Sequence, residues 1–166
     1  LMQSQRSAQV EYDFALNYSF WPWRLLTLIA PGLFGSPVAG DYWGYANFWE
    51  DAVYVGLLPL VLAISALFTS LRENAYSKKH RRLGWFLAVL LVLALLLALG
   101  KNTPIFPWLY RHVPTFDMFQ APTRWMIWAE FSLALLAGLG AERWRAPQGW
   151  GLYWTRLATM GALAVS

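Results

Sequence analysis

The 166-residue chain contains no cysteine and few charged residues. The absence of cysteine excludes disulfides, thiolate nucleophiles and cysteine-ligated metal centres. Charged residues make up 13% of the chain, about half of their usual share in a soluble domain, whereas hydrophobic residues make up 58%. The 13 Lys and Arg residues outnumber the 9 acids, but these cations stand mainly in short loops beside apolar runs. We therefore interpret the positive charge as a membrane-orientation signal and expect no nucleic-acid partner.

One long segment also lacks polar side chains. Residues 83–100 (LGWFLAVLLVLALLLALG) contain no charge, no side-chain amide and no proline. A helix rises about 1.5 Å per residue, so this segment nearly crosses a hydrocarbon core that is roughly 30 Å thick. A water-soluble helix of the same length would carry a polar stripe along one side. The segment therefore predicts a membrane span.

Three further apolar runs predict additional spans. Residues 52–71 contain no charge, and their Pro59 is tolerated in a membrane helix because neighbouring helices satisfy the freed carbonyl. Residues 125–141 contain a single charge, Glu130, and residues 157–166 begin a run that ends with the chain. The sequence thus predicts an all-α fold, a polytopic membrane helix bundle with about three full spans and a truncated fourth. We expect the chain to be an internal piece of a larger protein, because its start also lacks the features of a signal peptide.

The loops predict the orientation of these spans. The loop 72–82 carries five cations against one acid, and the loop 142–156 adds three arginines. Both loops are therefore expected on the cytoplasmic side, and residues 1–51 and 101–124 on the outer side. In a bacterium this places the protein in the cytoplasmic membrane as an integral, multi-pass protein in contact with membrane lipids.

The outer segments are too apolar to be simple linkers. Residues 21–35 predict an interfacial or re-entrant helix, or alternatively a buried helix that caps the bundle. Residues 41–51 combine five aromatic residues with three acids, which is typical of an aromatic belt at a membrane surface and also of a sugar-binding platform. The segment 101–124 contains four prolines, which exclude a long helix and predict short turns.

Three polar side chains are candidate functional groups. Arg124 stands at the predicted membrane boundary, where a guanidinium binds a lipid phosphate or a lipid-linked pyrophosphate, or simply extends to the headgroups. Glu130 is the only ionisable residue inside a predicted span, where it is either a structural ion-pair partner or an intramembrane functional group. His112, beside Arg111, is a proton carrier, a phosphate contact or a solvated loop residue.

The order of several motifs resembles the central region of the YfhO-like bacterial membrane proteins. The motifs are Trp23–Leu28 with Pro31 and Phe34–Gly35, then Asp41–Gly44, Tyr54–Leu60, Leu99–Pro104, Phe116–Trp125 and Leu136–Gly140. Together they cover most of the chain, from about Trp21 to Trp144. The family tends to have an arginine where this chain has Gln120, which leaves Arg124 as the one arginine of that loop motif.

The resemblance implies a GT-C-like architecture, in which an outer active site takes a sugar from a polyprenyl-phosphate donor. It implies that the catalytic acid stands in an outer loop upstream of this chain, so no catalytic residue is assigned here. By position, Arg124 would bind the donor phosphate, and Asp41 or Asp117 would contact the sugar or a metal. No cofactor is evident from the residues themselves, and a divalent metal is compatible with the family resemblance.

Two other classes of function stay open at this point. The chain could be a non-catalytic membrane subunit or scaffold that packs against protein partners in a larger complex. It could also belong to a transporter, with Glu130 and the interrupted helices as its site.

Overall fold

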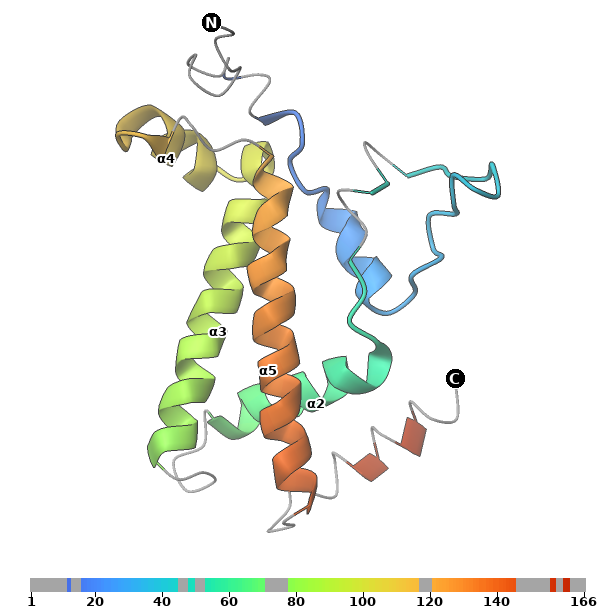
Figure 1. Ribbon diagram of the computed structural model, residues 1–166, viewed down its shortest axis with the longest axis vertical. Coiled ribbons are helices and arrows are strands. Elements are labelled where there is room, and N and C mark those ends of the chain that lie inside the picture. The colour runs from blue at the N-terminus through green and yellow to red at the C-terminus, as the bar shows by residue number, and fades with distance from the viewer. Residues whose placement is uncertain are drawn as a thin grey trace, which may run out of the picture. The chain divides into compact units, whose positions relative to one another are not determined.

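Every regular element in the described part of the chain is a helix (Figure 1). The computed structural model describes residues 12, 16–44, 48–49, 53–70, 78–116, 121–145, 156–157 and 160–161. No strand occurs among these residues, so the predicted all-α fold class is confirmed for them. The elements in chain order are η1 (Pro22–Leu28), α2 (Leu57–Ser70), α3 (Lys78–Ala98), η2 (Gly100–Asn102), α4 (Ile105–His112), η4 (Pro122–Trp125) and α5 (Met126–Arg145).

The chain divides into two compact units. Unit 1 consists of Leu1–Val53 and Leu93–Ile127, and unit 2 consists of Tyr54–Val92 and Trp128–Ser166. Unit 1 therefore contains both segments that the sequence predicts on the outer side, 1–51 and 101–124, together with the adjoining ends of two helices. Unit 2 contains the predicted cytoplasmic loops and most of the residues of the predicted spans.

Hydrogen bonds in unit 1 attach the segment of residues 18–20 to the end of α3. The backbone N–H of Phe20 donates to the Ala98 carbonyl at 2.9 Å, and the Asn102 side-chain amide donates to the Phe20 carbonyl at 2.8 Å. Ser19 Oγ accepts from the Lys101 backbone N–H at 2.9 Å. These bonds satisfy backbone groups that a helix end leaves without partners inside the helix, so the segment acts as the cap of α3.

Gly100 allows this close approach. Its φ of +50° lies in the left-handed region, which glycine adopts at little cost after the end of a helix. A Cβ atom at this position would collide with the side chain of Ser19 and would lie 2.9 Å from the Pro122 Cβ. The chain can therefore pass residue 100 in this way only if that residue carries no side chain.

The short helices of unit 1 end where the prolines require it. The 3-10 helix η1 has Pro22 in its first turn and covers the first part of the predicted helix 21–35, and turns follow it through Pro31. In the proline-rich segment, α4 begins directly after Pro104 and ends just before Val113 and Pro114. An eight-residue helix is therefore the longest element between residues 101 and 116, in keeping with the four prolines of this segment.

In unit 2, α2 begins later than the apolar run that predicts it. Pro59 lies in the first turn of α2, where its missing N–H costs nothing, and Gly56 before the helix has a φ of +95°. The helix is consequently 14 residues long instead of spanning the whole run 52–71. By contrast, α3 extends the run 83–100 backwards through the basic residues to Lys78, because lysine and arginine are good helix formers.

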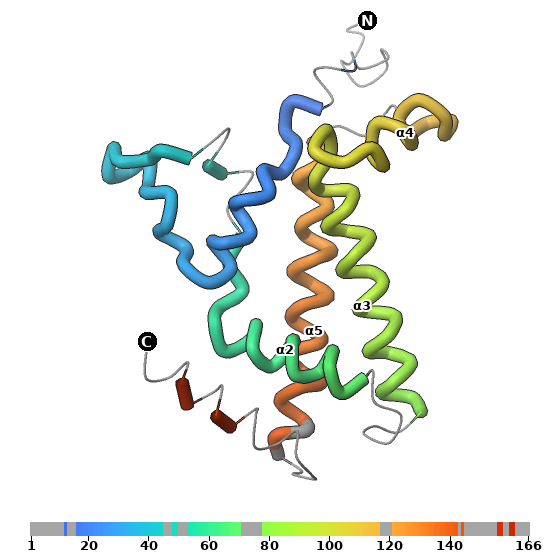
Figure 2. The backbone as a smooth tube through the Cα atoms, turned by 180° about the vertical axis from the view of Figure 1, so that it is seen from behind, coloured from blue at the N-terminus to red at the C-terminus, as the bar shows by residue number. Residues whose placement is uncertain are grey.

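The interior of unit 2 combines small side chains with leucines such as Leu87 and Leu136. In both backbone views the unit 2 portions of α3 and α5 run alongside each other (Figures 1 and 2). The buried positions include Ala63 and Ala66 on α2, Gly84 on α3, and Ala129, Ser132, Ala137 and Gly140 on α5. A Cβ atom on Gly140 would collide with the Leu62 backbone carbonyl, so α2 crosses α5 at very short range. Small residues permit such close helix crossings.

One helix in the described residues, α3, is long and apolar enough to cross a membrane by length and composition. The shorter apolar α2 is 14 residues long, below the length that a full crossing requires. Few side chains of α3 are buried, and Phe86 and Val92 are 61% and 54% exposed.

Two glycines on α5 should respond differently to substitution by alanine. We expect Gly140→Ala to lower the free energy of unfolding by about 1–3 kcal/mol, because the new methyl group forces α2 away from α5. Gly138 has no atom within 4 Å of the same position, so Gly138→Ala should be neutral or stabilise the helix by up to about 1 kcal/mol. Thermal or denaturant unfolding of both variants tests this pair. Equal effects of the two substitutions would contradict the close crossing.

Candidate functional site

The structure places two of the predicted site residues in unit 1. Asp41 and Arg124 both belong to this unit, whereas Glu130 belongs to unit 2. Asp117 lies outside the described residues. The pair that the family resemblance assigns to sugar and phosphate therefore shares one compact unit.

Asp41 has a structural task in its own loop. One carboxylate oxygen, Oδ1, accepts a hydrogen bond from the Ser36 backbone N–H at 2.8 Å, and the side chain is exposed. Gly35 adopts a φ of +72°, and a Cβ atom there would collide with the Asp41 backbone carbonyl. The loop thus closes on itself between residues 35 and 41, and the second carboxylate oxygen, Oδ2, is the one left for a ligand.

Arg124 extends from a firmly anchored turn. The preceding Pro122 and Thr123 are buried, and the Thr123 backbone N–H donates to the Tyr18 carbonyl at 3.0 Å. Ala121 adopts a left-handed φ of 55°, which redirects the chain into the 3-10 helix η4. The Arg124 side chain itself is exposed, just before α5 begins. This geometry presents a cation at the surface of unit 1 on a rigid base.

Glu130 and His112 offer less as functional groups. Glu130 is half-buried on α5, and no residue in the described part of the chain forms a hydrogen bond or ion pair with it. His112 is exposed, its ring stacks on Trp108 with 5.0 Å between ring centroids, and its Nδ1 lies 2.9 Å from the Trp108 carbonyl. His112 therefore stabilises the end of its own helix.

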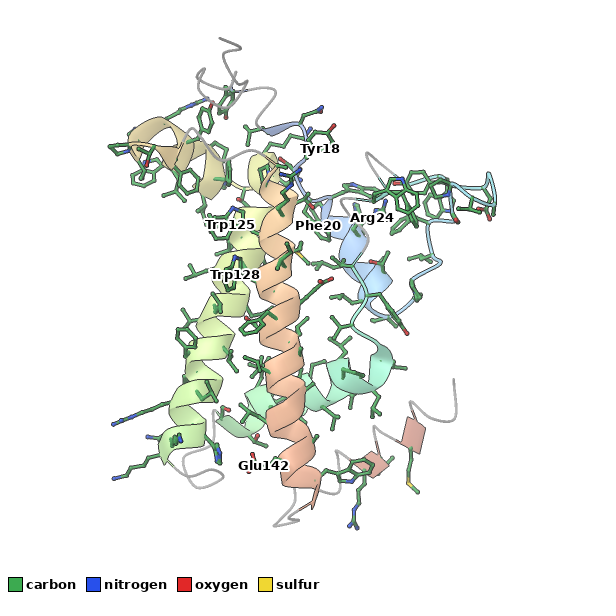
Figure 3. The ribbon with its side chains drawn as sticks, viewed as in Figure 1. Tyr18, Phe20, Arg24, Trp125, Trp128 and Glu142 are labelled. Atoms are coloured by element: carbon green, nitrogen blue, oxygen red, sulfur yellow. The ribbon has the colours of Figure 1, made fainter. Side chains whose placement is uncertain are left out.

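The most unusual polar residue is Arg24, which was not predicted as a site residue from the sequence. Arg24 lies on η1 and is 1% exposed, the largest of the fully buried side chains of the described chain. Its guanidinium carbon lies 5.2 Å from the Tyr42 ring centroid, 5.4 Å from that of Phe34 and 5.7 Å from that of Phe48. These four residues form what we call the arginine cluster, and Figure 3 shows Arg24 among the aromatic side chains.

The arginine cluster is embedded in further aromatic contacts. Phe34 packs against Trp21 and Trp43, with ring centroids 5.2 and 4.9 Å apart, and Tyr42 meets Phe48 edge to face at 5.5 Å. Thr27 fixes the backbone beneath it, because its hydroxyl lies 2.6 Å from the Arg24 carbonyl and 2.9 Å from the Val53 carbonyl. The cluster thus connects η1 to Phe34, Tyr42 and Phe48, and Thr27 connects it to Val53, shortly before α2.

The charge of Arg24 is only partly compensated. A terminal nitrogen, Nη2, donates to the Tyr42 hydroxyl, whereas Nε is buried and has no hydrogen-bond partner. Each contact between a cation and an aromatic face stabilises by about 0.5–2 kcal/mol, whereas transferring an ion out of water costs several kcal/mol. The rings therefore offset part of the cost of burial and leave one donor unused.

A signal for this cluster does exist in the sequence. Arg24 is the only charged residue between Asp13 and Asp41, within a strongly apolar stretch. A lone cation in such a stretch must either reach water or find compensation inside the fold. Its ring partners stand ten to twenty-four residues away, so the identity of the cluster could not be derived from local pattern.

The described residues contain no group of three or more His, Cys, Asp or Glu side chains that could hold a metal ion. Asp41 is the only acid among the described residues of unit 1. The divalent metal that the family resemblance allows therefore has one candidate ligand among these residues, Asp41.

Comparisons with known proteins return no counterpart: no protein-family model, no curated protein and no solved structure matches the chain. The resemblance to YfhO-like proteins consequently stays a prediction, and the proposals below depend on the geometry of the two units.

The hydrogen bond that Asp41 accepts within its loop can be tested separately from its negative charge. We expect Asp41→Ala to lower the free energy of unfolding by about 0.5–1.5 kcal/mol, because the Ser36 N–H loses its acceptor. Asp41→Asn keeps an acceptor oxygen at the same position and should retain most of the stability. Thermal unfolding together with limited proteolysis of the loop 35–41 compares the two variants. If both unfold like the unmodified protein, the hydrogen bond contributes nothing to the loop.

Proposed function

We propose that this chain forms part of a multi-pass integral membrane protein of the bacterial cytoplasmic membrane. The observation that carries the proposal is the set of large apolar side chains that unit 2 exposes on its portions of α2, α3 and α5, around a core of small residues and leucines. The exposed set comprises Phe68 on α2, Trp85, Phe86, Val89 and Val92 on α3, and Trp128, Phe131 and Leu135 on α5. Water would penalise such a surface, whereas lipid chains solvate it.

The hydroxyl groups of unit 2 support the same proposal. Ser132 Oγ donates to the Trp128 carbonyl at 2.7 Å, and Ser70 Oγ donates to the Ala66 carbonyl at 2.8 Å. In each case the acceptor lies four residues earlier in the same helix. Hydroxyls that bond back to their own helix need no water, which suits helices in a hydrocarbon environment.

We further propose that unit 1 belongs to the outer site of a GT-C-like glycosyltransferase that uses a polyprenyl-phosphate-linked sugar. Support comes from the grouping of both predicted outer segments into one unit that carries Asp41 and Arg124. Exposed tryptophans add a surface for sugar or lipid, since Trp23, Trp43, Trp49 and Trp108 are each more than half exposed. In this proposal Arg124 binds the donor phosphate, and Asp41 or Asp117 contacts the sugar or a metal.

The membrane proposal can be tested with single cysteines, because the natural chain has none. Three variants probe the predicted outer side, the predicted hydrocarbon region and the predicted cytoplasmic side: Val38→Cys, Val89→Cys and Lys79→Cys. In intact cells a membrane-impermeant maleimide should label Val38→Cys at once, and Lys79→Cys only after permeabilisation. Val89→Cys should stay unlabelled in both cases, although the Val89 side chain is 52% exposed in the protein itself.

Labelling of Val89→Cys as fast as Val38→Cys would contradict insertion of α3 into lipid. The matched comparison is informative because both valines are exposed, so only the surrounding solvent distinguishes them. Resistance of the unmodified protein to alkaline extraction provides an independent check.

The transferase proposal predicts a specific loss in Arg124→Ala. We expect about a 10- to 100-fold lower rate of sugar transfer from a polyprenyl-phosphate donor, because one charge-assisted contact to phosphate is removed. The control is Arg111→Ala, which removes an exposed arginine of the same unit that packs on the Tyr12 ring at 4.9 Å. Equal activity of both variants would remove Arg124 from the site. Absence of any transfer by the unmodified protein would favour the non-catalytic membrane subunit instead.

A further inference from the structure

The arginine cluster contains a cation that has no anionic partner among the described residues. The described acids are Asp41, Glu130 and Glu142, and none of them forms an ion pair with Arg24. Asp41 uses Oδ1 to hold the Ser36 N–H. A buried guanidinium normally faces a carboxylate or a phosphate, because its fixed fork of N–H donors matches their oxygens. The buried Nε of Arg24 has no hydrogen-bond partner, so its N–H is a donor that an anion could use.

We propose that the arginine cluster is an oxyanion-binding site that takes the phosphate group of an ester or of inorganic phosphate. The Nε–H of Arg24 and its neighbouring terminal nitrogen would donate to two phosphate oxygens, and the Tyr42 hydroxyl orients the guanidinium. The rings of Phe34, Tyr42 and Phe48 exclude water and strengthen the attraction between the charges.

The surroundings favour a phosphate over other oxyanions. Trp43 and Trp49, the neighbours of Tyr42 and Phe48 in the chain, are 65% and 71% exposed. Exposed tryptophans of this kind are typical of the membrane–water interface, where phosphate esters are the abundant anions. This choice of ligand depends on the proposed membrane location, but it does not require that the protein transfers a sugar.

Access to Arg24 requires only a local rearrangement. The side chain is buried beneath Tyr42 and Phe48, and both of these residues are themselves half-buried. The proposal requires that one of these rings rotates and makes the guanidinium accessible. The guanidinium would then lose its contact with one aromatic face and gain direct contact with the ligand. This exchange is favourable for an anion and unfavourable for a neutral molecule.

The test uses the purified protein in a phosphate-free detergent such as dodecyl maltoside. Thermal unfolding and titration calorimetry are recorded with inorganic phosphate, with geranyl phosphate and with uncharged geraniol. We expect at least one of the two phosphate ligands to raise the melting temperature in a concentration-dependent manner, and geraniol to have no effect. A response to inorganic phosphate identifies the free anion as sufficient, and a response to geranyl phosphate alone identifies a lipid phosphate.

Variants of the cluster connect this response to Arg24. Arg24→Met keeps the volume and removes the charge, so we expect phosphate affinity to fall about 100-fold. Without ligand, the same variant should melt at the same temperature as the unmodified protein or higher, because an uncompensated buried charge has been replaced by an apolar side chain. Tyr42→Phe keeps the ring and should weaken binding about tenfold. Arg111→Met, the matched control at an exposed arginine, should bind normally.

Several outcomes would overturn the proposal. They are the absence of a response to both phosphate ligands, an equal response to geraniol, and a response that persists in Arg24→Met. A lower melting temperature of Arg24→Met that Glu50→Gln or Asp51→Asn reproduces would assign the counterion to the chain itself and also exclude a ligand. If Arg24→Met does not fold, Arg24→Lys decides, since it keeps the charge, loses the fork and should bind about tenfold more weakly. Phosphate binding without sugar transfer would contradict the proposed enzyme and leave this site intact.

Discussion

The helices of unit 2 bury small residues and several leucines between them, and they also expose many large apolar side chains. Gly140 shows the constraint most directly, because the backbone of α2 occupies the space that any side chain at this position would need. With glycine at this position, the backbones of α2 and α5 come into direct contact, which small residues permit. The outward rings and aliphatic chains then require an apolar surrounding, and this requirement underlies the proposed place of the protein in a membrane.

Unit 1 joins the end of the long apolar helix α3 to segments that are rich in proline and aromatic residues. Ser19 and Phe20 bond to Ala98, Lys101 and Asn102 and thereby satisfy polar groups where α3 ends. The Thr123 N–H reaches the same strip of chain through the Tyr18 carbonyl. Residues 18–20 therefore hold both the turn that carries Arg124 and the end of α3. The helix η1, which carries Arg24, begins shortly after this segment, at Pro22.

Arg24 and Arg124, both in unit 1, represent opposite ways of keeping a cation in an apolar region. Arg124 stands exposed on an anchored turn, where water or headgroups can solvate it. Arg24 is enclosed by three rings, which compensate a charge without providing an acceptor for every donor. Asp41, which the family resemblance favours as a ligand, uses one oxygen to close its own loop. The structure thus adds a second candidate to Arg124, the buried Arg24, whose partners the sequence pattern does not indicate.

The sequence by itself determined the all-α class, the apolar run at 83–100 and the short elements of the proline-rich segment, because composition, propensity and proline act locally. The first residue of α2 follows from Gly56 and Pro59, which are also local signals, although the apolar run alone suggested a longer helix. Only the tertiary structure decided that Gly140 lies against α2 whereas Gly138 faces open space, since both occur in one short motif. It also decided the partners of Arg24, because Phe34, Tyr42 and Phe48 reach the guanidinium through the path of a long loop. Such contacts depend on which surfaces distant in the sequence pack together, and local sequence patterns do not determine this packing.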